Sequence, residues 1–402
     1  MKHNQDVLDI IDYSINAVLP DQAVKNALKN VSFKQGKVIL VAIGKASYQM
    51  AKTAIESIDI DKGIVISKYN HIKTKLNNIE TYEAGHPISD ENAIIATKRA
   101  LQLTSNLSKD DTVLFLVSGG CSALFEDSQL SLDEIQDINN QLLKSGASIN
   151  EINTIRKRLS NVKGGKFAKH VQPANIYQIV LSDIINDPLD MIASGPAAID
   201  TSTTIDAINI ISKYNLKLSN KAIQLINQET IKELNNVQTI FAGNLKLLCE
   251  AAANKAKQLG YKPIIVKTDE NGFAKDAGKQ FALLANKQEK NTCLIMGGET
   301  VVKVTGTGLG GRNQEFVLSA SKYINDNVTL FSIGSDGTDG PTDAAGAYVD
   351  KTIKDKIKEL NIDIDLVLNN NDSYNTLKQL DALIITGPTG TNVNDLMVAL
   401  IK

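Results

Sequence analysis

One repeated pattern limits the fold of this chain more than any other feature: short apolar runs end in glycine or other small residues, and helical patterns follow. The runs are KVILVAIGKAS, TVLFLVSGGCSA, IYQIVLSDI, TIFAGN, TCLIMGGET, VTLFSIGSDGTDG and ALIITGPTG. Uninterrupted apolar stretches such as residues 38–43 and 113–117 are typical of strands that are buried on both faces. Their alternation with helices predicts an open α/β sheet, which binds its ligands at the carboxyl ends of the strands. The glycine turns are expected at those ends.

The two halves of the chain differ in their hydrophobic patterns, which predicts two domains. Residues 201–236 are polar and helical and contain no glycine turn, so we place the boundary at their end. Residues 1–236 are expected to form a Rossmann-like, three-layer α/β domain with a parallel sheet. Residues 237–402 are expected to form an α/β domain with a mixed sheet, because ETVVKVTG alternates as a strand with one exposed face does. Residues 7–18 have the spacing of an amphipathic helix.

Composition excludes several classes of protein. Among 402 residues there are 43 basic and 45 acidic ones, a balance that predicts no nucleic-acid partner. Cys121, Cys249 and Cys293 lack metal-type spacing and lie in or beside apolar runs, as buried free thiols of a reducing compartment do. No window reaches the roughly 18 apolar residues of a membrane span, and the first residues do not form a signal peptide. We therefore expect a cytoplasmic protein that does not bind membranes.

The first glycine turn carries a lysine. Lys45 follows Gly44 where a strand ends and a helix begins. A cation at the positive end of a helix dipole is unfavourable unless an anion lies nearby, and the exposed backbone amides there also favour an anion. Lys45 is thus a candidate ligand for a phosphate or carboxylate, against the simpler interpretation of a solvated lysine. The P-loop motif is absent.

A second turn carries small and hydroxyl residues at the end of the next apolar run. They are Ser118, Gly119, Gly120 and Ser122. Such a turn is able to form an anion-binding nest of backbone amides. A tight turn with a serine cap explains the same residues equally well.

Basic residues and one histidine add candidates for an anion site. Arg156, Lys163 and Lys166 belong to a basic segment with a KGGK turn, which is either a solvated face or a source of cations for the site. His86 precedes a proline and a predicted helix, and is either a substrate ligand or part of a capped turn.

Three carboxylates follow one apolar run. Asp183, Asp187 and Asp190 suit metal binding or proton abstraction, although some of them can serve as helix caps. Asp187 is the first choice because it lies in the middle of the loop. A further loop contains Asp336 and Asp339, which suit a Mg²⁺ site or a rigid turn and do not fit the EF-hand order.

The stretch TGTGLGGR contains the dinucleotide fingerprint G-x-G-x-x-G, formed by Gly306, Gly308 and Gly311. The preceding segment carries charged residues, which a central parallel strand tolerates poorly. Arg312 follows the last glycine directly, and a guanidinium grips oxyanions through two bonds. We therefore favour a flexible loop, with Gly308 and Gly310 close to a ligand, that carries Arg312 to an oxyanion.

Taken together, eight motifs in order along the chain resemble those of the glycerate 2-kinases of the second type. The motifs are GKAS, GHPISDENA, SGGCSALFE, NTIRKRLSNVKGGKFA, SDIINDPLDMIASGP, GGETVVKVTGTGLGGRNQEF, GSDGTDGPTDAAGA and GPTGTNVNDL. This resemblance implies a Rossmann-like N-terminal domain, a MOFRL-type C-terminal domain and an active site in the cleft between them. It also implies transfer of the γ-phosphoryl group of ATP to D-glycerate with Mg²⁺, giving 2-phosphoglycerate and ADP.

The resemblance assigns Lys45, Arg312 and Asp187 to catalysis, the last with Asp183 and Asp190 as alternatives. The two turns and the Lys163–Lys166 segment would hold oxyanions, and Asp336 or Asp339 would contact the metal ion. Other interpretations stay open: an NAD(P)-dependent hydroxypyruvate reductase, a kinase for another small acid or sugar, and a non-catalytic sugar-acid binding protein. The oligomeric state stays open between a monomer and a homodimer.

Overall fold

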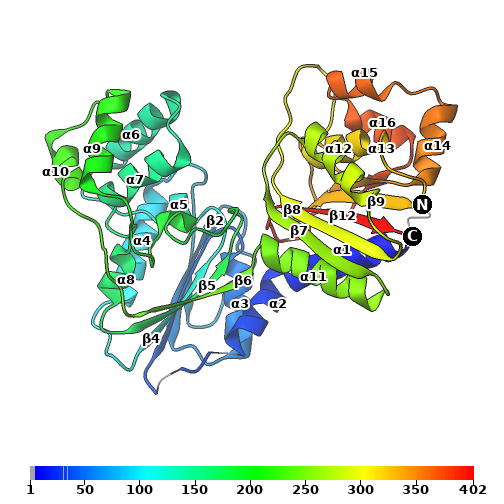
Figure 1. The fold of residues 1–402 in the computed structure, drawn as a ribbon. Helices are drawn as coiled ribbons and strands as arrows, with labels where there is room; N and C mark the ends of the chain where they lie inside the picture. Colours follow the sequence, from blue (N-terminus) through cyan, green and yellow to red (C-terminus); the bar gives the residue numbers. More distant parts are fainter. Residues whose placement is uncertain (1–4, 30, 34) are drawn as a thin grey trace. The chain divides into compact units, whose positions relative to one another are not determined.

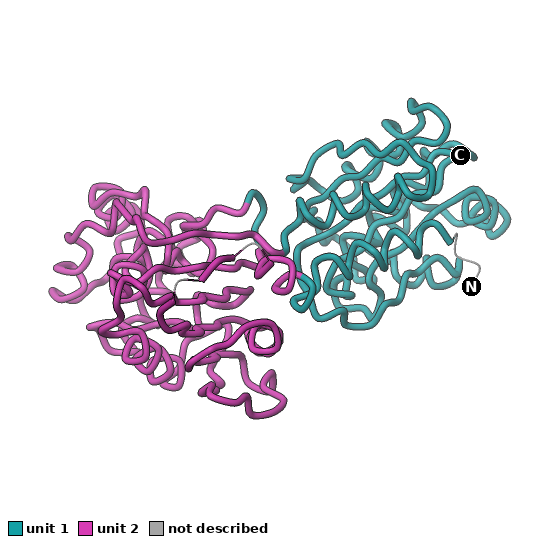
Figure 2. Tube along the Cα trace, turned by 90° about the horizontal axis from the view of Figure 1, so that it is seen from below, with its two compact units in different colours: residues 1–22, 183–186, 243–402 teal, residues 23–182, 187–242 magenta. Residues whose placement is uncertain are grey.

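The computed structural model describes residues 5–29, 31–33 and 35–402, and the chain forms two compact units (Figure 2). The N-terminal unit comprises residues 23–182 and 187–242, and the C-terminal unit comprises residues 1–22, 183–186 and 243–402. The sequence suggests a division between residues 236 and 237, which does not anticipate that residues 5–22 belong to the C-terminal unit. The apolar face of α1 (Gln5–Ala17) is buried in the core of the C-terminal unit.

The N-terminal unit is built on a six-stranded sheet. Its order is β3 (Ile79–Ala84), β2 (Lys62–Lys68), β1 (Val38–Ile43), β4 (Thr112–Val117), β5 (Asn175–Leu181) and β6 (Val237–Gly243). The pairs β1–β2, β1–β4, β2–β3 and β4–β5 are parallel. This is the Rossmann order, in which the chain reverses direction across the sheet between β1 and β4. The sequence-based expectation of a Rossmann-like domain with a parallel sheet is confirmed.

Side-chain alternation along the buried strands creates the layers of this unit. Leu40 and Leu114 face a core shared with α2 (Pro20–Leu28) and α3 (Ser47–Ser57). Phe115 points to the other face, where its ring packs against those of Phe125 and Phe167. The remaining helices of the unit are α4 (Glu91–Leu103), α5 (Cys121–Leu124), α6 (Leu132–Lys144), α7 (Ile149–Leu159), α8 (Lys166–Val171), the 3₁₀ helix η1 (Ile192–Ser194), α9 (Thr204–Tyr214) and α10 (Asn220–Ile226).

The C-terminal unit has a mixed six-stranded sheet (Figure 1). Its order is β11 (Leu383–Ile384), β10 (Gly346–Val349), β9 (Val328–Gly334), β12 (Asp395–Ile401), β8 (Thr292–Gly298) and β7 (Lys262–Glu270). Only β7 and β8 pair in parallel; the other neighbours pair antiparallel. The helices besides α1 are α11 (Leu245–Gln258), α12 (Ala274–Ala285), α13 (Arg312–Ser321), α14 (Lys351–Glu359), α15 (Ile364–Asn369) and α16 (Ser373–Gln379). The predicted mixed sheet is confirmed.

All seven apolar runs that the sequence analysis singled out contain strands: β1, β4, β5, β6, β8, β9 and β11. Five strands were not predicted, because most of them lack a long apolar run that ends in a glycine turn: β2, β3, β7, β10 and β12. One expectation was wrong: residues 299–306 form no strand, and only Val301 makes an isolated bridge, to Phe273.

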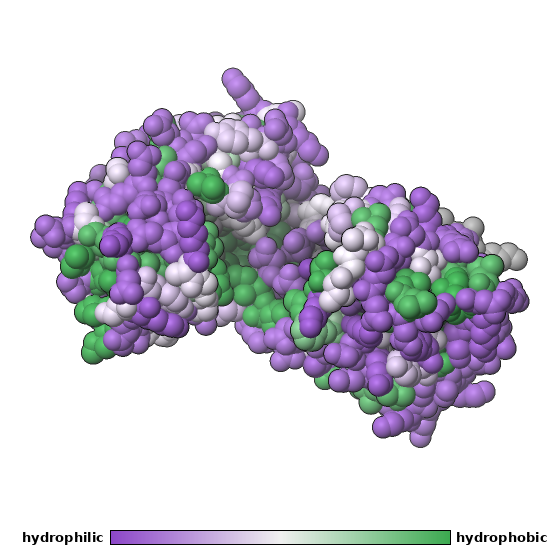
Figure 3. Space-filling view, turned by 90° about the horizontal axis from the view of Figure 1, so that it is seen from above, coloured by the Kyte–Doolittle hydropathy of each residue, from purple (hydrophilic) through white to green (hydrophobic). Residues whose placement is uncertain are grey.

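The three cysteines are buried and free, as expected, and burial raises the pKa of each thiol to about 12. In Figure 3, hydrophilic residues cover most of the visible surface and hydrophobic residues form smaller groups between them. Within the described ranges, no helix combines the length and the apolar composition that crossing a bilayer requires.

Candidate active site

The turns that follow β1 and β4 are joined by hydrogen bonds where the strand order reverses. The amide of Lys45 donates to the carbonyl of Gly119 (2.9 Å), and the amide of Ala46 donates to Oγ of Ser118 (3.1 Å). Gly44 has φ +121°, and a Cβ at this position would collide with Ser118. Only glycine therefore allows the two turns to approach so closely. In open α/β sheets, ligands bind in the crevice between the two turns that lie where the strand order reverses, which is called the switch point.

A cluster of cations surrounds this crevice. A Cβ on Gly120 would lie 2.9 Å from the His86 ring and 3.3 Å from Cγ of Lys45, so these three residues are neighbours. Nδ1 of His71 lies 3.0 Å from the carbonyl of Lys45. The pKa of His86 is lowered, first by burial and then by the positive charges of Lys45, Lys68 and His71. The exposed lysine and the histidine beside it form a corner that attracts anions.

The ammonium group of Lys45 is exposed, and in the described part of the chain no carboxylate forms an ion pair with it. This distinguishes Lys45 from the buried lysines of the same unit. A cation without a partner, at the start of a helix and beside a glycine turn, fits an oxyanion ligand that arrives from solvent.

The cations of the basic segment that includes α7 and α8 contact other protein groups, whereas the sequence suggested that they bind a ligand. Lys163 is completely buried and forms an ion pair with Glu126. Lys166 donates to two backbone carbonyls at 3.1 and 2.5 Å, and burial lowers the pKa of its ammonium to about 8. Nε of Arg156 donates to Asn139 (2.7 Å). In this structure Lys163 and Lys166 stabilise the fold around α7, and neither presents a free cation to a ligand.

The three carboxylates after β5 have different surroundings. Asp190 accepts from the ammonium of Lys157 at 2.8 Å. Asp183 lies in the segment that belongs to the C-terminal unit, where Nδ2 of Asn394 donates to its carbonyl at 3.0 Å. Asp187 is half-buried and has φ +49°, an uncommon conformation for this residue type. The ion pair with the buried Lys157 gives Asp190 a role in the fold, and Asp187 stays the candidate for a reacting carboxylate that the sequence predicts.

A chain of polar side chains supports the end of the same loop and joins the predicted Ser122 to two residues, Ser194 and Asn153, that were not predicted as site residues. Ser194 donates to Oδ1 of Asn153 (2.9 Å), and its hydroxyl lies 3.4 Å from that of Ser122. Ala193 and Ser194 are buried with φ of 55° and 60°. Left-handed conformations of non-glycine residues are strained and cluster at functional sites. The one sequence signal was the SGP turn.

In the C-terminal unit, Arg312 is the first residue of α13 and contacts two carboxylates. Its Nε and Nη2 donate to Asp395 at 2.6 and 3.0 Å, and its Nη1 donates to Glu299 at 3.3 Å. Asp395 is fully buried, and burial raises the pKa of its carboxyl to about 6 although Arg312 opposes this rise. Asp395 and Glu299 were not among the residues predicted from sequence, because they lie 83 and 13 positions from Arg312.

The two aspartates proposed as metal ligands differ in availability. Asp339 is buried and accepts hydrogen bonds from the amides of Asn313 (3.1 Å) and Gln314 (2.9 Å), so it caps α13. Asp336 is half-buried and accepts one bond, from the amide of Thr338 at 2.9 Å. Across the residues that the structure describes, no three histidine, cysteine, aspartate or glutamate side chains group as metal ligands. Asp339 serves the fold, and Asp336 is the carboxylate with a free oxygen.

The glycine loop before Arg312 is packed against another part of the same unit. The amides of Gly306, Gly308 and Leu309 donate to residues 370–372 at 2.9, 2.8 and 3.1 Å. A Cβ on Gly308 would lie 2.5 Å from Cβ of Asp372, and one on Gly310 would collide with the next residue of that segment. Because these amides are occupied, the loop cannot cradle a pyrophosphate as the fingerprint would require. The glycines allow close packing, and the expectation of a flexible loop with Gly308 and Gly310 at a ligand is not supported.

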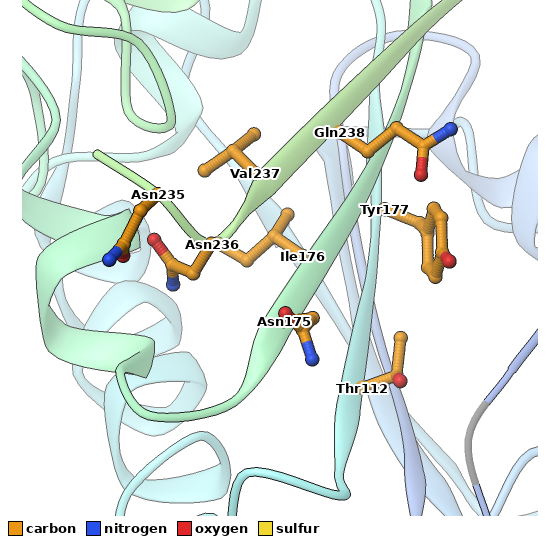
Figure 4. Close-up of a pocket in the computed structure, with 8 residues that line it drawn as sticks. All are labelled: Thr112, Asn175, Ile176, Tyr177, Asn235, Asn236, Val237 and Gln238. Atoms are coloured by element: carbon orange, nitrogen blue, oxygen red, sulfur yellow. The ribbon is translucent and has the colours of Figure 1, made fainter.

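A separate cavity of about 240 Å³ lies at the amino ends of the strands of the parallel sheet, opposite the turns described above (Figure 4). Its lining comes from the first residues of β4, β5 and β6 and the turn before β6: Thr112, Asn175, Ile176, Tyr177, Asn235, Asn236, Val237 and Gln238. Amide side chains dominate this lining and no charged residue contributes. The position at the amino ends of the strands, away from the switch point, makes this cavity a poor candidate for the active site.

Comparisons with known proteins cover nearly the whole chain. The model of a domain of unknown function, DUF4147, matches residues 6–227, and the model of the MOFRL family matches residues 292–395. A protein of Thermotoga maritima named D-glycerate 2-kinase is 48% identical over 98% of this chain and 97% of its own length. A glycerate 2-kinase of Pyrococcus horikoshii is 40% identical over 98% of this chain and 96% of its own length.

The fold agrees with these matches. The crystal structure of a glycerate kinase from Thermotoga maritima superposes with a TM-score of 0.94 at 48% identity, and the match covers 99% of both chains. The similarity therefore extends through both units and includes the segments that carry Lys45 and Arg312.

Proposed function

The chain belongs to the glycerate 2-kinase family, and from this premise we propose that it transfers the γ-phosphoryl group of ATP to the 2-hydroxyl of D-glycerate. The products are 2-phosphoglycerate and ADP. The observation that carries the proposal is the similarity over the full length of the chain to relatives named glycerate 2-kinase. The cationic corner at the β1–β4 switch point supports it, because both substrates are anions.

Phosphoryl transfer needs positioning and charge neutralisation more than covalent chemistry by the protein. We assign Lys45 and Arg312 to the binding of substrate oxyanions, because each presents donors at the start of a helix. The hydroxyl and amides of residues 118–122 and the imidazole of His86 add donors around Lys45. Asp187 orients or deprotonates the acceptor hydroxyl, a role that suits a half-buried carboxylate in the loop after β5.

The phosphates of ATP would bring Mg²⁺ to the site. This ion is usually held by one or two carboxylates together with phosphate oxygens and water, and it neutralises charge that develops on the transferred group. The donor set fits this arrangement in a limited way, since Asp336 has one oxygen without a hydrogen bond from the loop. We assign Asp336 as the protein ligand and leave Asp339 out.

The test is to incubate the protein with ATP, Mg²⁺ and D-glycerate and to resolve 2- from 3-phosphoglycerate. Lys45→Ala and Arg312→Ala should each lower kcat by about 10²–10³, the usual effect of losing one electrostatic donor at a reacting oxyanion. Lys52→Ala is a matched control, because this lysine pairs only with the exposed Glu56 at 3.9 Å. Absence of any phosphoglycerate would refute the activity, and normal kcat/KM in both variants would refute the assignment of residues.

Three rivals make different predictions. An NAD(P)-dependent hydroxypyruvate reductase would change the nicotinamide absorbance when given hydroxypyruvate, and the occupied amides of the glycine loop argue against it. A non-catalytic sugar-acid binding protein would bind D-glycerate without turnover. A kinase for another small acid or sugar would form ADP with a different acceptor, which an acceptor screen with ATP reveals.

A further inference from the structure

Arg312 has two carboxylate partners whose environments are opposite. The side chain of Asp395 is 0% exposed and accepts two hydrogen bonds from the guanidinium. The side chain of Glu299 is 47% exposed and accepts one, at the longer distance of 3.3 Å. The side chain of Arg312 remains 35% exposed, so a ligand from solvent is able to reach it. Because the two carboxylates differ in burial and in the number of bonds to Arg312, we expect them to have different roles.

Asp395 is held rigidly. It is the first residue of β12, the strand between β8 and β9, and it is in register with Gly298 on one side and Gly334 on the other. A Cβ on Gly334 would lie 3.6 Å from Oδ1 of Asp395, an ordinary contact distance, so the carboxylate lies directly beside β9. Two parallel N–H···O bonds fix both the position and the plane of the guanidinium.

Glu299 is held only by its backbone. It follows the last residue of β8, and its amide donates to the carbonyl of Glu270 at 2.7 Å. Among the residues that the structure describes, its carboxylate makes one hydrogen bond, with Nη1 of Arg312. Exposed ion pairs of this kind contribute little free energy, so an anion that binds Arg312 in better geometry displaces Glu299 at small cost.

We propose that Asp395 is a positioning residue for Arg312, and that Glu299 occupies the exposed edge of the guanidinium until an oxyanion of a substrate takes its place. This inference rests on the proposed function, because it takes Arg312 to be the ligand of a substrate oxyanion. The oxyanion is either a phosphate of ATP or the carboxylate of D-glycerate. Separate titrations with ATP and with D-glycerate determine which of the two substrates supplies it.

The first experiment uses Glu299→Gln, which keeps the shape of the side chain and removes its charge. Because the competing carboxylate is weakened, KM for the substrate that meets Arg312 should fall about two- to five-fold with little change in kcat. Glu289→Gln is the matched control, since this exposed glutamate precedes β8 at the opposite end of the strand. An unchanged or higher KM in Glu299→Gln would overturn the displaceable role.

A second variant separates the contact from the general effect of a nearby negative charge. Glu299→Asp keeps the charge but shortens the side chain by one methylene, so the contact with Nη1 is lost. Displacement of a direct contact predicts that KM falls in Glu299→Asp as well. A wild-type KM in this variant, beside a lowered KM in Glu299→Gln, would overturn the role of the contact.

Asp395→Asn tests the positioning role. The variant is isosteric and weakens the bidentate grip, so kcat should fall at least about ten-fold while thermal unfolding shows that the protein is folded. A wild-type kcat would overturn this role. Calorimetric titration of ATP alone and of D-glycerate alone into wild type and Glu299→Gln separates this inference from the proposed function. Tighter binding in the variant supports the inference even without turnover, whereas unchanged binding in a protein that is an active kinase refutes the inference alone.

Discussion

Burial of the Asp395 carboxyl is expected to lower the free energy of unfolding at neutral pH, and the pH dependence of unfolding measures this cost. The perturbation is Asp395→Asn, which replaces a fully buried carboxyl with a neutral group of the same shape. Four charged groups surround the carboxyl: Arg312 from α13, Glu299 behind that arginine, and Asp336 and Asp339 from the loop after β9. Burial outweighs the single arginine and raises the pKa of Asp395 from 3.8 to about 6.

The magnitude follows from this difference. One pKa unit corresponds to about 1.4 kcal/mol, so a rise of about two units amounts to about 3 kcal/mol. Because the pKa is higher in the folded than in the unfolded protein, the folded state binds the proton more tightly. This contribution to the free energy of unfolding is present in full below about pH 4 and is lost as the pH rises through about 6.

Asparagine does not titrate, so the variant should not lose this contribution. The assay is urea unfolding of wild type and Asp395→Asn at several pH values between about 4 and about 7. Other groups titrate equally in both proteins and cancel in the difference. The free energy of unfolding of the variant should gain about 3 kcal/mol relative to wild type across this range. A difference that does not change with pH, or that changes in favour of wild type, would refute the reasoning.

Three further predictions concern other parts of the molecule. Asp190→Asn removes one partner of the buried Lys157, which holds the loop of Asp187, so kcat should fall about ten-fold. The control is Glu229→Gln, which alters an exposed carboxylate 3.7 Å from Arg158 and should leave kcat unchanged in the same assay. Lys45→Met removes a positive charge that disfavours protonation of His86, so the pKa of that imidazole should rise toward its usual value in an NMR titration. Gly308→Ala should destabilise the protein by about 1–3 kcal/mol in thermal unfolding, because the added methyl group would meet backbone and side-chain atoms of residues 370–372.

The sequence predicted the fold well where the physical signal is local. An apolar run with a glycine turn is enough to predict a buried strand and its carboxyl end, as β1 and β4 show. Lys45 could be chosen for the same reason, since the turn and the following helix dictate its surroundings. The contacts of Arg312 could not, because Asp395 reaches it only through the pairing of β12 with β8 and β9.

The basic residues of one segment show a second limit of prediction from sequence. Lys163 and Arg156 belong to the same basic segment, and nothing local tells which cation is buried. The partner of Lys163 is Glu126, 37 positions earlier, and the aromatic core between the sheet and α8 brings the two together. A charge run therefore predicts cations but not their availability, which depends on carboxylates that the tertiary structure supplies.

The glycine fingerprint and the Rossmann sheet occur in different units, and this separation bears on the chemistry. A dinucleotide site needs both at one strand–helix turn. Here the β1 turn of the Rossmann sheet has one glycine and Lys45, whereas G-x-G-x-x-G follows β8, whose neighbour β12 is antiparallel and whose loop amides are already occupied. The switch point thus presents a side-chain cation where a dinucleotide-binding protein presents free amides. A point charge that neutralises phosphoryl oxygens suits group transfer from ATP better than it suits holding a nicotinamide cofactor for hydride transfer.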